Sequence, residues 1–352
     1  MKLGDCLRGL PGPIMVTGHT GFKGTWLTIL LQQLEIPVIG LSLEPTKNSL
    51  FDRASRLGLV TEEFIDIRDV AAVTQFVSKY HPSAIIHMAA QPLVLESYKT
   101  PRETFEINVM GTTNILSAAF LEPSVTAVGV ITTDKVYQND DSGRAFVESD
   151  ALSGKDPYSA SKTAAEAVVK AWQQIAKVAG GPRVLSLRAG NVLGGGDWAE
   201  NRLLPDLIRA FKEQNKIQLR NPDSTRPWMH VLDPLQGYLL AIGHSIQGDD
   251  DEAFNFGPNS KSLTVKRIAE LSQSAWPYPV NISVANDPVN KIFEAGSLSL
   301  NSAKAKQVLG WSPVWSQEQA VISSVKWWDE VLNNHVTPYD ACINDISHLL
   351  ND

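Results

Sequence analysis

Short apolar or β-branched runs alternate with longer amphipathic stretches through the first half of this chain. Strands are expected at residues 13–17, 37–43, 63–66, 84–89, 125–132 and 183–188. Helices are expected between them at residues 22–35, 70–80, 108–120 and 158–179. Strands and helices that alternate in this way are typical of a parallel sheet covered by helices. The sequence therefore predicts an α/β fold built on a doubly wound parallel sheet.

The second half of the chain has a looser pattern. With 352 residues, the chain can form one large α/β domain with an appended lobe, or two domains. Segments 194–198 and 221–228 are dense in Gly, Pro, Asn and Trp, and they flank a helix expected near residues 204–213. Such loops at the mouth of an α/β sheet suit a substrate site, although an ordinary irregular surface also contains them. We expect residues 1–190 to form a Rossmann-type domain, to which some later segments return, and residues 191–352 to form mainly a smaller C-terminal substrate-binding lobe.

A glycine-rich loop follows the first expected strand and opens the first expected helix. Its motif residues are Gly18, His19, Gly21, Phe22, Lys23 and Gly24. Glycine allows a tight turn close to a pyrophosphate, whose charge is met by free N–H groups and the positive end of the helix dipole. The spacing is G-x-x-G-x-x-G rather than the G-x-G-x-x-G of the commonest dehydrogenases. The loop predicts a binding site for a nicotinamide dinucleotide.

The end of the second expected strand lacks a residue that such sites usually contain. An Asp or Glu there normally accepts hydrogen bonds from the adenosine ribose of NAD, but residues 40–46 contain no acid at that place. Ser42 or Glu44 could substitute for it. The choice between NAD and NADP therefore stays open at this point.

Two further segments belong to the expected cofactor site because each follows a strand. Asp66 could bind the adenine amine, with Ile67 against one face of the ring; alternatively, Asp66 caps the helix that follows. Ala89, Ala90 and Gln91 follow the fourth strand, where small residues let the chain pass close to a cofactor.

Tyr158 and Lys162 lie four residues apart in an expected helix, about 140 residues after the glycine loop. A helix turns once every 3.6 residues, so both side chains lie on one face. A tyrosine hydroxyl, with a pKa near 10, is a poor base at neutral pH, but a nearby cation favours the phenolate and lowers that pKa. An exposed Tyr beside an exposed Lys has the same spacing. Together with the glycine loop, however, the pair indicates proton transfer from a sugar alcohol while hydride leaves its carbon.

Composition excludes several other classes of function. The net charge is −7 and no basic cluster exists, which argues against binding of nucleic acid. Cys6 and Cys342 are the two cysteines, so neither a disulfide framework nor a cysteine zinc site is indicated, and no trio of His, Asp, Glu or Cys has ligand spacing. No apolar run of about 18 residues and no signal-peptide core are present. We therefore expect no metal and no membrane association, and a cytoplasmic protein.

Several segments between residues 14 and 233 indicate a more specific class of protein. They are residues 17–24, 87–92, 133–137, 188–198 and 226–230, with a weaker match at residues 309–313. With the glycine spacing and the Tyr-x-x-x-Lys pair, the chain resembles the extended short-chain dehydrogenase/reductase family. More narrowly, it is similar to the sugar-nucleotide 4,6-dehydratases, and among these to the members that act on CDP-glucose.

This resemblance implies a reaction without net redox change. It implies NAD as cofactor and CDP-glucose as substrate, with oxidation at C4 of the glucose unit, loss of water across C5 and C6, and return of hydride to C6. The product is a 4-keto-6-deoxy sugar, and the oxidised cofactor is regenerated within one turnover.

The resemblance also implies catalytic roles for named residues. Tyr158 takes the C4 hydroxyl proton, Lys162 orients the nicotinamide ribose and holds the phenolate, and Thr133 hydrogen-bonds the C4 oxygen. A protonated Asp134 would be the general acid for the departing hydroxyl. Lys135 stands where many relatives that act on dTDP-sugars carry a glutamate as C5 base, and a lysine there needs a lowered pKa. Alternatively, Asp134 and Lys135 form only a solvated turn.

Substrate contacts are expected mainly from the second half of the chain. Arg226 and Arg202 are candidates to hold the diphosphate, and Asn191 matches a position that contacts phosphate or sugar in the family. Trp198 and Trp228 could cover the sugar or the base, or could simply be core. The matched segments complete the expected substrate site with Leu203 and His230.

Other functions remain open within this interpretation. An epimerase or reductase of the same family would share the loop and the Tyr-Lys pair but would lack the acid and base beside Thr133. Another sugar-nucleotide 4,6-dehydratase is the nearest alternative, because no single residue identifies cytidine. A dinucleotide-sensing regulator on this fold would typically lose the tyrosine. The resemblance also implies a homodimer, or a dimer of dimers, built partly from the helices that start at Tyr158 and near Asn108.

Overall fold

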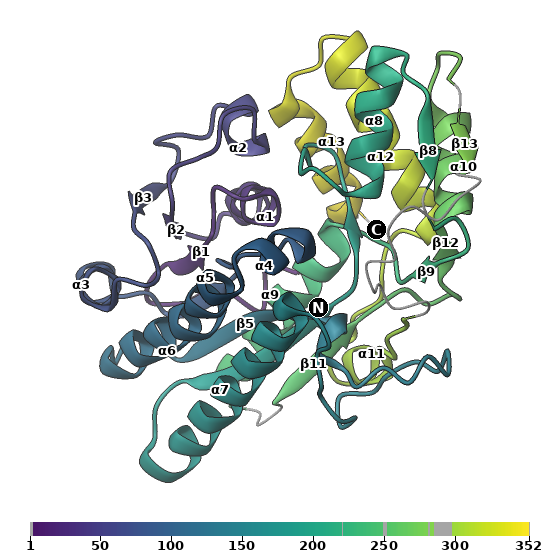
Figure 1. Cartoon of the computed structure of the whole chain (residues 1–352). Coiled ribbons are helices and arrows are strands. Elements are labelled where there is room, and N and C mark those ends of the chain that lie inside the picture. Colours follow the sequence, from purple (N-terminus) through teal and green to yellow (C-terminus); the bar gives the residue numbers. More distant parts are fainter. Residues whose placement is uncertain (1–2, 220, 249–251, 281, 285–297, 352) are drawn as a thin grey trace.

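The computed structural model describes residues 3–219, 221–248, 252–280, 282–284 and 298–351. Its centre is a seven-stranded sheet in the order β11-β6-β5-β4-β1-β2-β3, and every pairing in it is parallel (Figure 1). The strands are β1 (Ile14–Thr17), β2 (Val38–Ser42), β3 (Thr61–Phe64), β4 (Ala84–His87), β5 (Ala127–Thr133), β6 (Arg183–Ala189) and β11 (Ala253–Phe256). The predicted Rossmann-type, doubly wound sheet is confirmed.

Helices cover both faces of the sheet, because alternate residues of each strand point to opposite sides. In β1, Ile14 and Val16 belong to one buried cluster, whereas Met15 belongs to a second cluster on the other face. The first cluster includes α1 (Phe22–Gln33) and α9 (Leu232–Ile246). The second includes α3 (Val70–Tyr80), α6 (Gly111–Leu121) and α7 (Pro157–Ala179).

The expected elements of the first half are present, with shifted ends in several places. The third strand begins at Thr61 and ends at Phe64, two residues before its expected bounds. The helix expected from residue 108 begins as a π-helical turn, Glu106–Met110, which leads directly into α6. Three short helices were not expected: α2 (Leu50–Arg53), α4 (Val94–Lys99) and α5 (Pro101–Phe105).

The later part of the chain forms short strand pairs and helices. The paired strands are β7 (Val192–Leu193) with β10 (Met229–His230), β9 (Thr225–Arg226) with β12 (Leu263–Thr264), and β8 (Ile217–Leu219) with β13 (Ile282–Val284). The helices are α8 (Leu203–Glu213), α10 (Val265–Ala275), α11 (Ala303–Leu309), α12 (Gln317–Asn333) and α13 (Pro338–Asn351). Because α9 and β11 pack in the sheet region, segments from beyond residue 190 complete it; the division of the chain near that residue stays a proposal.

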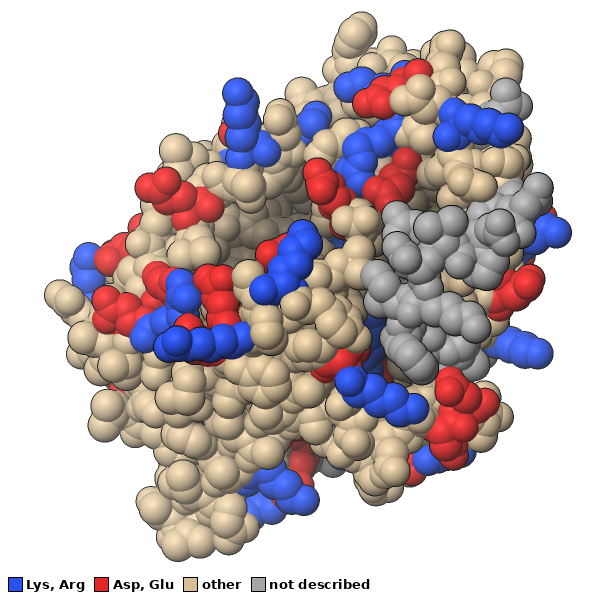
Figure 2. Space-filling view, viewed as in Figure 1, with Lys and Arg blue, Asp and Glu red and all other residues tan. Residues whose placement is uncertain are grey.

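The order of strands locates the edge at which ligands bind. The chain runs from β1 through β2 to β3 on one side and then returns to β4 on the other side of β1. Ligands of open α/β sheets bind outside the carboxyl ends of the strands at such a reversal. Figure 2 shows a hollow between the part of the molecule that carries α1 and α4 and the part that carries α8 and α12.

The helices were compared with what a membrane-spanning helix requires. Among the residues described, none of the helices combines the length and the apolar character that crossing a bilayer requires. On the face seen in Figure 2, acidic and basic side chains are interspersed rather than gathered by sign.

Candidate active site

The glycine loop lies at the reversal between β1 and β4. Gly18 has φ of 72°, and a Cβ on it would lie 2.9 Å from the Cα of Ala89. A Cβ on Gly24 would lie 2.1 Å from the carbonyl oxygen of Gly18. Gly21 is the N-cap of α1 and no side chain caps this helix end. The loop is therefore a backbone cradle at a helix N-terminus, which fits the pyrophosphate of a dinucleotide.

The His19 side chain is buried against strands β2 and β3. Its Nε2 lies 2.7 Å from Oε2 of Glu62, and a Cβ on Gly40 would lie 2.5 Å from the ring. Burial lowers the pKa of His19, despite the opposing effect of Glu62. A hydrogen bond from the Nε2 side of the ring to a cofactor is therefore not supported, and His19 is a core residue of the loop.

Lys23 and Phe22 begin α1 and face the second half of the chain. The Lys23 Nζ lies 3.4 Å from the hydroxyl of Tyr238 on α9. Burial, with the nearby Arg202 and Lys162, lowers the pKa of Lys23 to about 8. Phe22 packs on Gly194, where a Cβ would lie 3.0 Å from its ring.

The expected adenine contacts follow β3. Asp66 accepts hydrogen bonds from the backbone and guanidinium of Arg68, which lower its pKa. Asp69, not Asp66, is the N-cap of α3, because its side chain accepts from Ala72. The alternative that Asp66 caps this helix is therefore wrong. Ile67 is buried against Gly111, where a Cβ would lie 2.3 Å from its side chain.

The expected substitutes for the missing ribose acid differ in their surroundings. Ser42 is buried, and its hydroxyl is 2.7 Å from that of Thr20 in the glycine loop. Glu44 is exposed. The hydroxyl of Ser42 is therefore already bonded to the loop, whereas no hydrogen bond or ion pair of the Glu44 side chain is found among the described residues.

The segment after β4 is held by Asn108, a residue that we did not assign to the site. The Asn108 side chain accepts from the backbone N–H of Gln91 (2.8 Å) and donates to the Gln91 carbonyl (3.1 Å) and to Ser161 on α7 (2.9 Å). The Gln91 side chain donates to the carbonyl of Leu93 (3.2 Å), which fixes its own loop, and to Thr104 of α5 (3.0 Å). Asn108 therefore connects the cofactor edge of the sheet to the helix that carries Tyr158.

Tyr158 and Lys162 lie on the buried face of α7. The helix starts with a capping box, in which the Asp156 side chain accepts from the Ser159 N–H and the Ser159 side chain bonds back. Lys162 Nζ donates to the carbonyl of Ile131 at 3.0 Å. Burial lowers the pKa of Lys162 to about 8.

The Tyr158 hydroxyl differs from the sequence expectation in one respect. It lies beside Thr133, and burial raises its pKa to about 12 in the ligand-free chain. Lys162 bonds to the Ile131 carbonyl instead of lowering that pKa. Desolvation therefore outweighs the effect of the neighbouring cation until a ligand changes the site.

Thr133 is the last residue of β5, and Asp134 and Lys135 follow it directly. The Thr133 hydroxyl donates to Asp134 Oδ1 at 2.9 Å. Asp134 is 1% exposed, and burial raises its pKa. Within the part of the chain that the structure covers, Asp134 Oδ2 has no hydrogen-bond partner; it lies 3.3 Å from where a Cβ on Gly190 would be. A solvated turn is therefore wrong for Asp134, whereas Lys135 is half-buried.

Two arginines of the expected substrate site lie near these catalytic candidates. Arg202 forms an ion pair with Asp197 at 3.0 Å, and its charge acts on Tyr158. Arg226 is buried at the end of β9, and its charge acts against the raised pKa of Asp134.

The remaining expected substrate residues are two half-buried side chains and two tryptophans. Asn191 and Leu203 are half-buried beside β7 and α8, and Trp198 packs on Trp328 with ring centroids 4.8 Å apart. Trp228 is 5% exposed and donates from Nε1 to the carbonyl of Leu263. The tryptophans therefore agree with the alternative that they pack in the core.

His230 is also a core residue. It is fully buried, its ring stacks on Trp315 at 4.3 Å, and it lies edge-on to Trp26. Its Nε2 is 3.4 Å from Asp345 of α13. We therefore withdraw His230 from the expected substrate site, because its ring is fully buried among aromatic side chains. The sequence motif gave no sign of this enclosure.

No described group of three or more His, Cys, Asp or Glu side chains is arranged to hold a metal ion. His87, inside one of the matched segments, instead bonds Thr17 (2.7 Å) and Thr112 (3.0 Å) through its two ring nitrogens. Burial lowers the pKa of His87 to about 3, so it is neutral.

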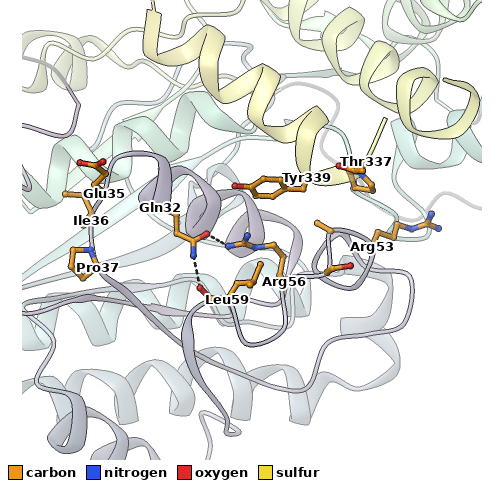
Figure 3. Close-up of a pocket in the computed structure, with 12 residues that line it drawn as sticks. Gln32, Glu35, Ile36, Pro37, Arg53, Arg56, Leu59, Thr337 and Tyr339 are labelled. Atoms are coloured by element: carbon orange, nitrogen blue, oxygen red, sulfur yellow. Dashed lines mark hydrogen bonds between the residues drawn. The ribbon is translucent and has the colours of Figure 1, made fainter. Parts of the chain in front are cut away.

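A separate cavity of about 990 Å³ lies away from these residues (Figure 3). It is formed where the end of α1, the start of β2 and the start of α13 meet, and Arg56 lies in it between Gln32 and Tyr339. None of the residues expected to bind cofactor or substrate lines it. This cavity is thus separate from the chemical site.

The site and the fold agree with known proteins. Residues 14–257 match the NAD dependent epimerase/dehydratase family. The chain is 38% identical over 323 residues to a CDP-glucose 4,6-dehydratase from Salmonella typhimurium, with 89% of each protein covered. It is 28% identical to a UDP-glucose 4-epimerase from Halalkalibacterium halodurans, over 90% of this chain and 95% of that one.

A crystal structure of dTDP-glucose 4,6-dehydratase from Bacillus anthracis in complex with NAD has the same fold, with a TM-score of 0.77 at 22% identity over 93% of this chain and 99% of that one. A glycine cradle and a buried Tyr-Lys pair at the reversal of a parallel sheet define a nicotinamide-dependent enzyme. The chain belongs to the NAD dependent epimerase/dehydratase family, and its cofactor is NAD.

Proposed function

We propose that this protein dehydrates CDP-glucose to CDP-4-dehydro-6-deoxyglucose. The observation that carries the proposal is Asp134, a buried carboxyl with a raised pKa and an unpartnered oxygen, directly beside Thr133 and Tyr158. Hydride transfer alone needs no such acid, whereas elimination of a hydroxyl does. The relative named CDP-glucose 4,6-dehydratase supports the choice of substrate.

The first step removes the C4 hydrogen and the proton of its hydroxyl. Bound NAD supplies the hydride acceptor and, once reduced, the hydride donor for C6. Tyr158 takes the hydroxyl proton, and Thr133, which lies beside Tyr158, positions the sugar oxygen. Because the ligand-free Tyr158 is protonated at neutral pH, the positive charge of an oxidised nicotinamide bound beside it would favour the phenolate.

Elimination then needs an acid at the C6 hydroxyl and a base at C5. Asp134, kept protonated by burial, donates its proton to the departing hydroxyl. Lys135, the next residue and only half-buried, is the proposed base for the C5 proton, a role that requires its amine to be neutral in the substrate complex. The new ketone at C4 acidifies that proton, so a modest base is sufficient.

The nucleotide diphosphate is held by cations from the second half of the chain. Arg226 lies close enough to Asp134 to act on its charge, and Arg202 acts on Tyr158, so both reach the reacting sugar. Asn191 and Leu203 complete this side of the site. The buried Trp228 and His230 shape its wall from behind rather than contact the sugar.

The protein is proposed to act as a homodimer through α6 and α7. Exposed apolar side chains lie on both helices, among them Met110 at the π-turn before α6, Leu121, Ile175 and Val178. Figure 1 shows α6 and α7 side by side at one margin of the molecule. Sedimentation of the purified chain tests this; a monomer at micromolar concentration contradicts it.

One assay separates the proposed function from its alternatives. The protein is incubated with CDP-, dTDP-, UDP- and GDP-glucose, and the alkali-induced absorbance of a 4-keto-6-deoxy sugar is recorded. CDP-glucose deuterated at C4 should give a product with deuterium in its new methyl group. A 4-epimer without dehydration would favour the epimerase alternative, and turnover of another nucleotide alone would show that CDP is wrong.

A further inference from the structure

Three side chains on one face of α7 lie against the last three residues of β5. Lys162 donates to the carbonyl of Ile131 at 3.0 Å, and Glu166 accepts from the hydroxyl of Thr132 at 2.5 Å. Tyr158 lies beside Thr133. The helical residues are spaced by four, so they form one row. Glu166 therefore extends the Tyr158 and Lys162 row by one turn toward the core.

Glu166 is held more firmly than either residue before it in the row. Its Oε1 accepts from Thr132 and from Arg188 Nε at 2.8 Å, and its Oε2 accepts from Ser186 and from Arg188 NH2, both at 2.7 Å. The guanidinium thus binds it bidentately across α7 and β6. Although burial alone would raise it, these bonds lower the pKa of Glu166, so the carboxylate is charged.

Arg188 extends this network to the segment after Thr133. Its NH1 donates to the Tyr137 hydroxyl at 2.9 Å and to the carbonyl of Glu148 at 3.0 Å. The Tyr137 hydroxyl in turn donates to Asn255 of β11 at 2.7 Å. Thr132 and Tyr137, which lie on either side of Thr133 and Asp134 in the chain, are therefore both bonded to the buried ion pair of Glu166 and Arg188. The Glu166 carboxylate cannot move without displacing these residues.

The charged and titratable groups around Lys162 come from several elements. Lys23 of α1 repels it, and His87 of β4 is neutral because of burial. Tyr158 precedes it by one turn. Burial lowers the pKa of Lys162 and Glu166 raises it. Glu166 is therefore the anion that favours the charged form of Lys162.

We infer that Glu166 is a positioning residue, which keeps Lys162 charged and in place against β5 during the reaction proposed above. The inference rests on the proposed function, since it concerns the step in which Lys162 holds the nicotinamide ribose and the Tyr158 phenolate. Glu166 itself contacts neither the substrate nor the cofactor. Its effect passes through one side chain, four residues away on the same helix face.

The test variant is Glu166→Gln combined with Arg188→Met. Glutamine keeps a bonding partner for Thr132 and Ser186. The second change avoids a buried unpaired guanidinium, which would strongly destabilise the protein. The alkaline limb of the kcat profile should move to lower pH by about one unit, with the KM of CDP-glucose unchanged. Ser186→Ala is the matched control; it removes one bond to Glu166 but not its charge, so the limb stays in place.

A second readout does not depend on turnover. The ammonium of Lys162 is titrated by NMR in the ligand-free protein labelled with ¹³C-lysine, and its signal is assigned with Lys162→Arg. Its titration should move to lower pH in the double variant and remain unmoved in Ser186→Ala. If the double variant does not fold, Glu166→Asp, which withdraws the charge by one methylene, should move both readouts in the same direction by less.

Unmoved kcat and NMR titrations in a folded variant overturn the role of Glu166. A wild-type protein that converts none of the nucleotide-activated glucoses overturns the proposed function instead. In that case the NMR titration still decides whether Glu166 controls the charge of Lys162. The two failures are therefore distinguishable.

Discussion

At the scale of single residues, burial decides the chemistry. Asp134 and Tyr158 both have raised pKa values because their side chains have left water. For Asp134 the shift favours the protonated carboxyl that a general acid needs. The pKa of Tyr158 is raised to about 12, so its hydroxyl is protonated at neutral pH, and the positive charge of an oxidised nicotinamide would favour the phenolate.

Replacement of Tyr158 by Phe removes the hydroxyl and keeps the ring in its buried place. We expect turnover of CDP-glucose to fall by at least about a hundredfold, as the loss of acid-base catalysis does. Tyr339→Phe, the same chemical change beside the separate cavity, should leave turnover unchanged. Near-normal rates for Tyr158→Phe would remove this residue from the mechanism.

Asp134→Asn keeps the shape of the side chain but cannot donate an acid proton. Single-turnover absorbance should still report reduction of bound NAD, whereas the 4-keto-6-deoxy product should be at least about a hundredfold slower to form. In the wild type, elimination should slow as pH rises through the raised pKa of Asp134, because only the protonated form is active. Unchanged product formation in Asp134→Asn would exclude it as the acid.

At the scale of elements, α7 is the structure that brings the catalytic groups together. Its capping box defines where it starts, two residues before Tyr158, and its buried row fixes it to β5. The helix end and the catalytic residue are thus coupled. A loosened first turn should disturb chemistry as well as stability.

The capping residue allows a direct test of this coupling. Asp156→Ala should lower the free energy of unfolding by about 1 kcal/mol and reduce kcat. Ser316→Ala removes the equivalent capping box of α12, far from Tyr158 in the chain, and should cost a similar amount of stability with no loss of kcat. Urea unfolding and steady-state rates measure both; equal rates in the two variants would show that the start of α7 has no catalytic effect.

At the scale of the whole molecule, one continuous core joins the sheet to the C-terminal helices. The buried cluster that contains Ile14 and Val16 also contains Trp327 and Trp328 of α12 and Ile346 of α13. Lobe and sheet are therefore packed as one unit.

Asp233, at the start of α9, lies within this joint. Its carboxylate accepts from Val314 N at 2.7 Å, its carbonyl accepts from Trp311, and burial raises its pKa to about 7. A carboxyl in the unfolded chain has a pKa near 4, so between these values the folded protein binds more protons. Stability should therefore fall as pH rises from about 4 through 7.

Asp233→Asn removes this titration and keeps an acceptor for Val314. We expect the variant to be more stable than the wild type at about pH 8, by on the order of 2 kcal/mol, and equal to it at acidic pH. Urea unfolding at several pH values measures the difference. Parallel stability curves for the two proteins would show that Asp233 is not the group that titrates.

Local patterns in the sequence were sufficient for much of the fold and for part of the site. Helix α3 has the bounds that its periodicity predicts, and the spacing of Tyr158 and Lys162 places both on the buried face of α7. These features depend on neighbours within one or two turns or on alternation along a strand. The short helices α4 and α5 were missed because segments of five or six residues carry too little periodicity.

The alternation of strands and helices, the glycine loop between them and the row of residues on α7 follow from the amino-acid order alone, because each arises from local spacing. In contrast, the burial of Asp134, the enclosure of His230 by tryptophans and the pairing of Glu166 with Arg188 beneath the site are visible only in the folded molecule. The physical reason is that burial and pairing join residues far apart in the chain. Since desolvation and partner charges set pKa values, the chemistry of the site is a property of the folded chain.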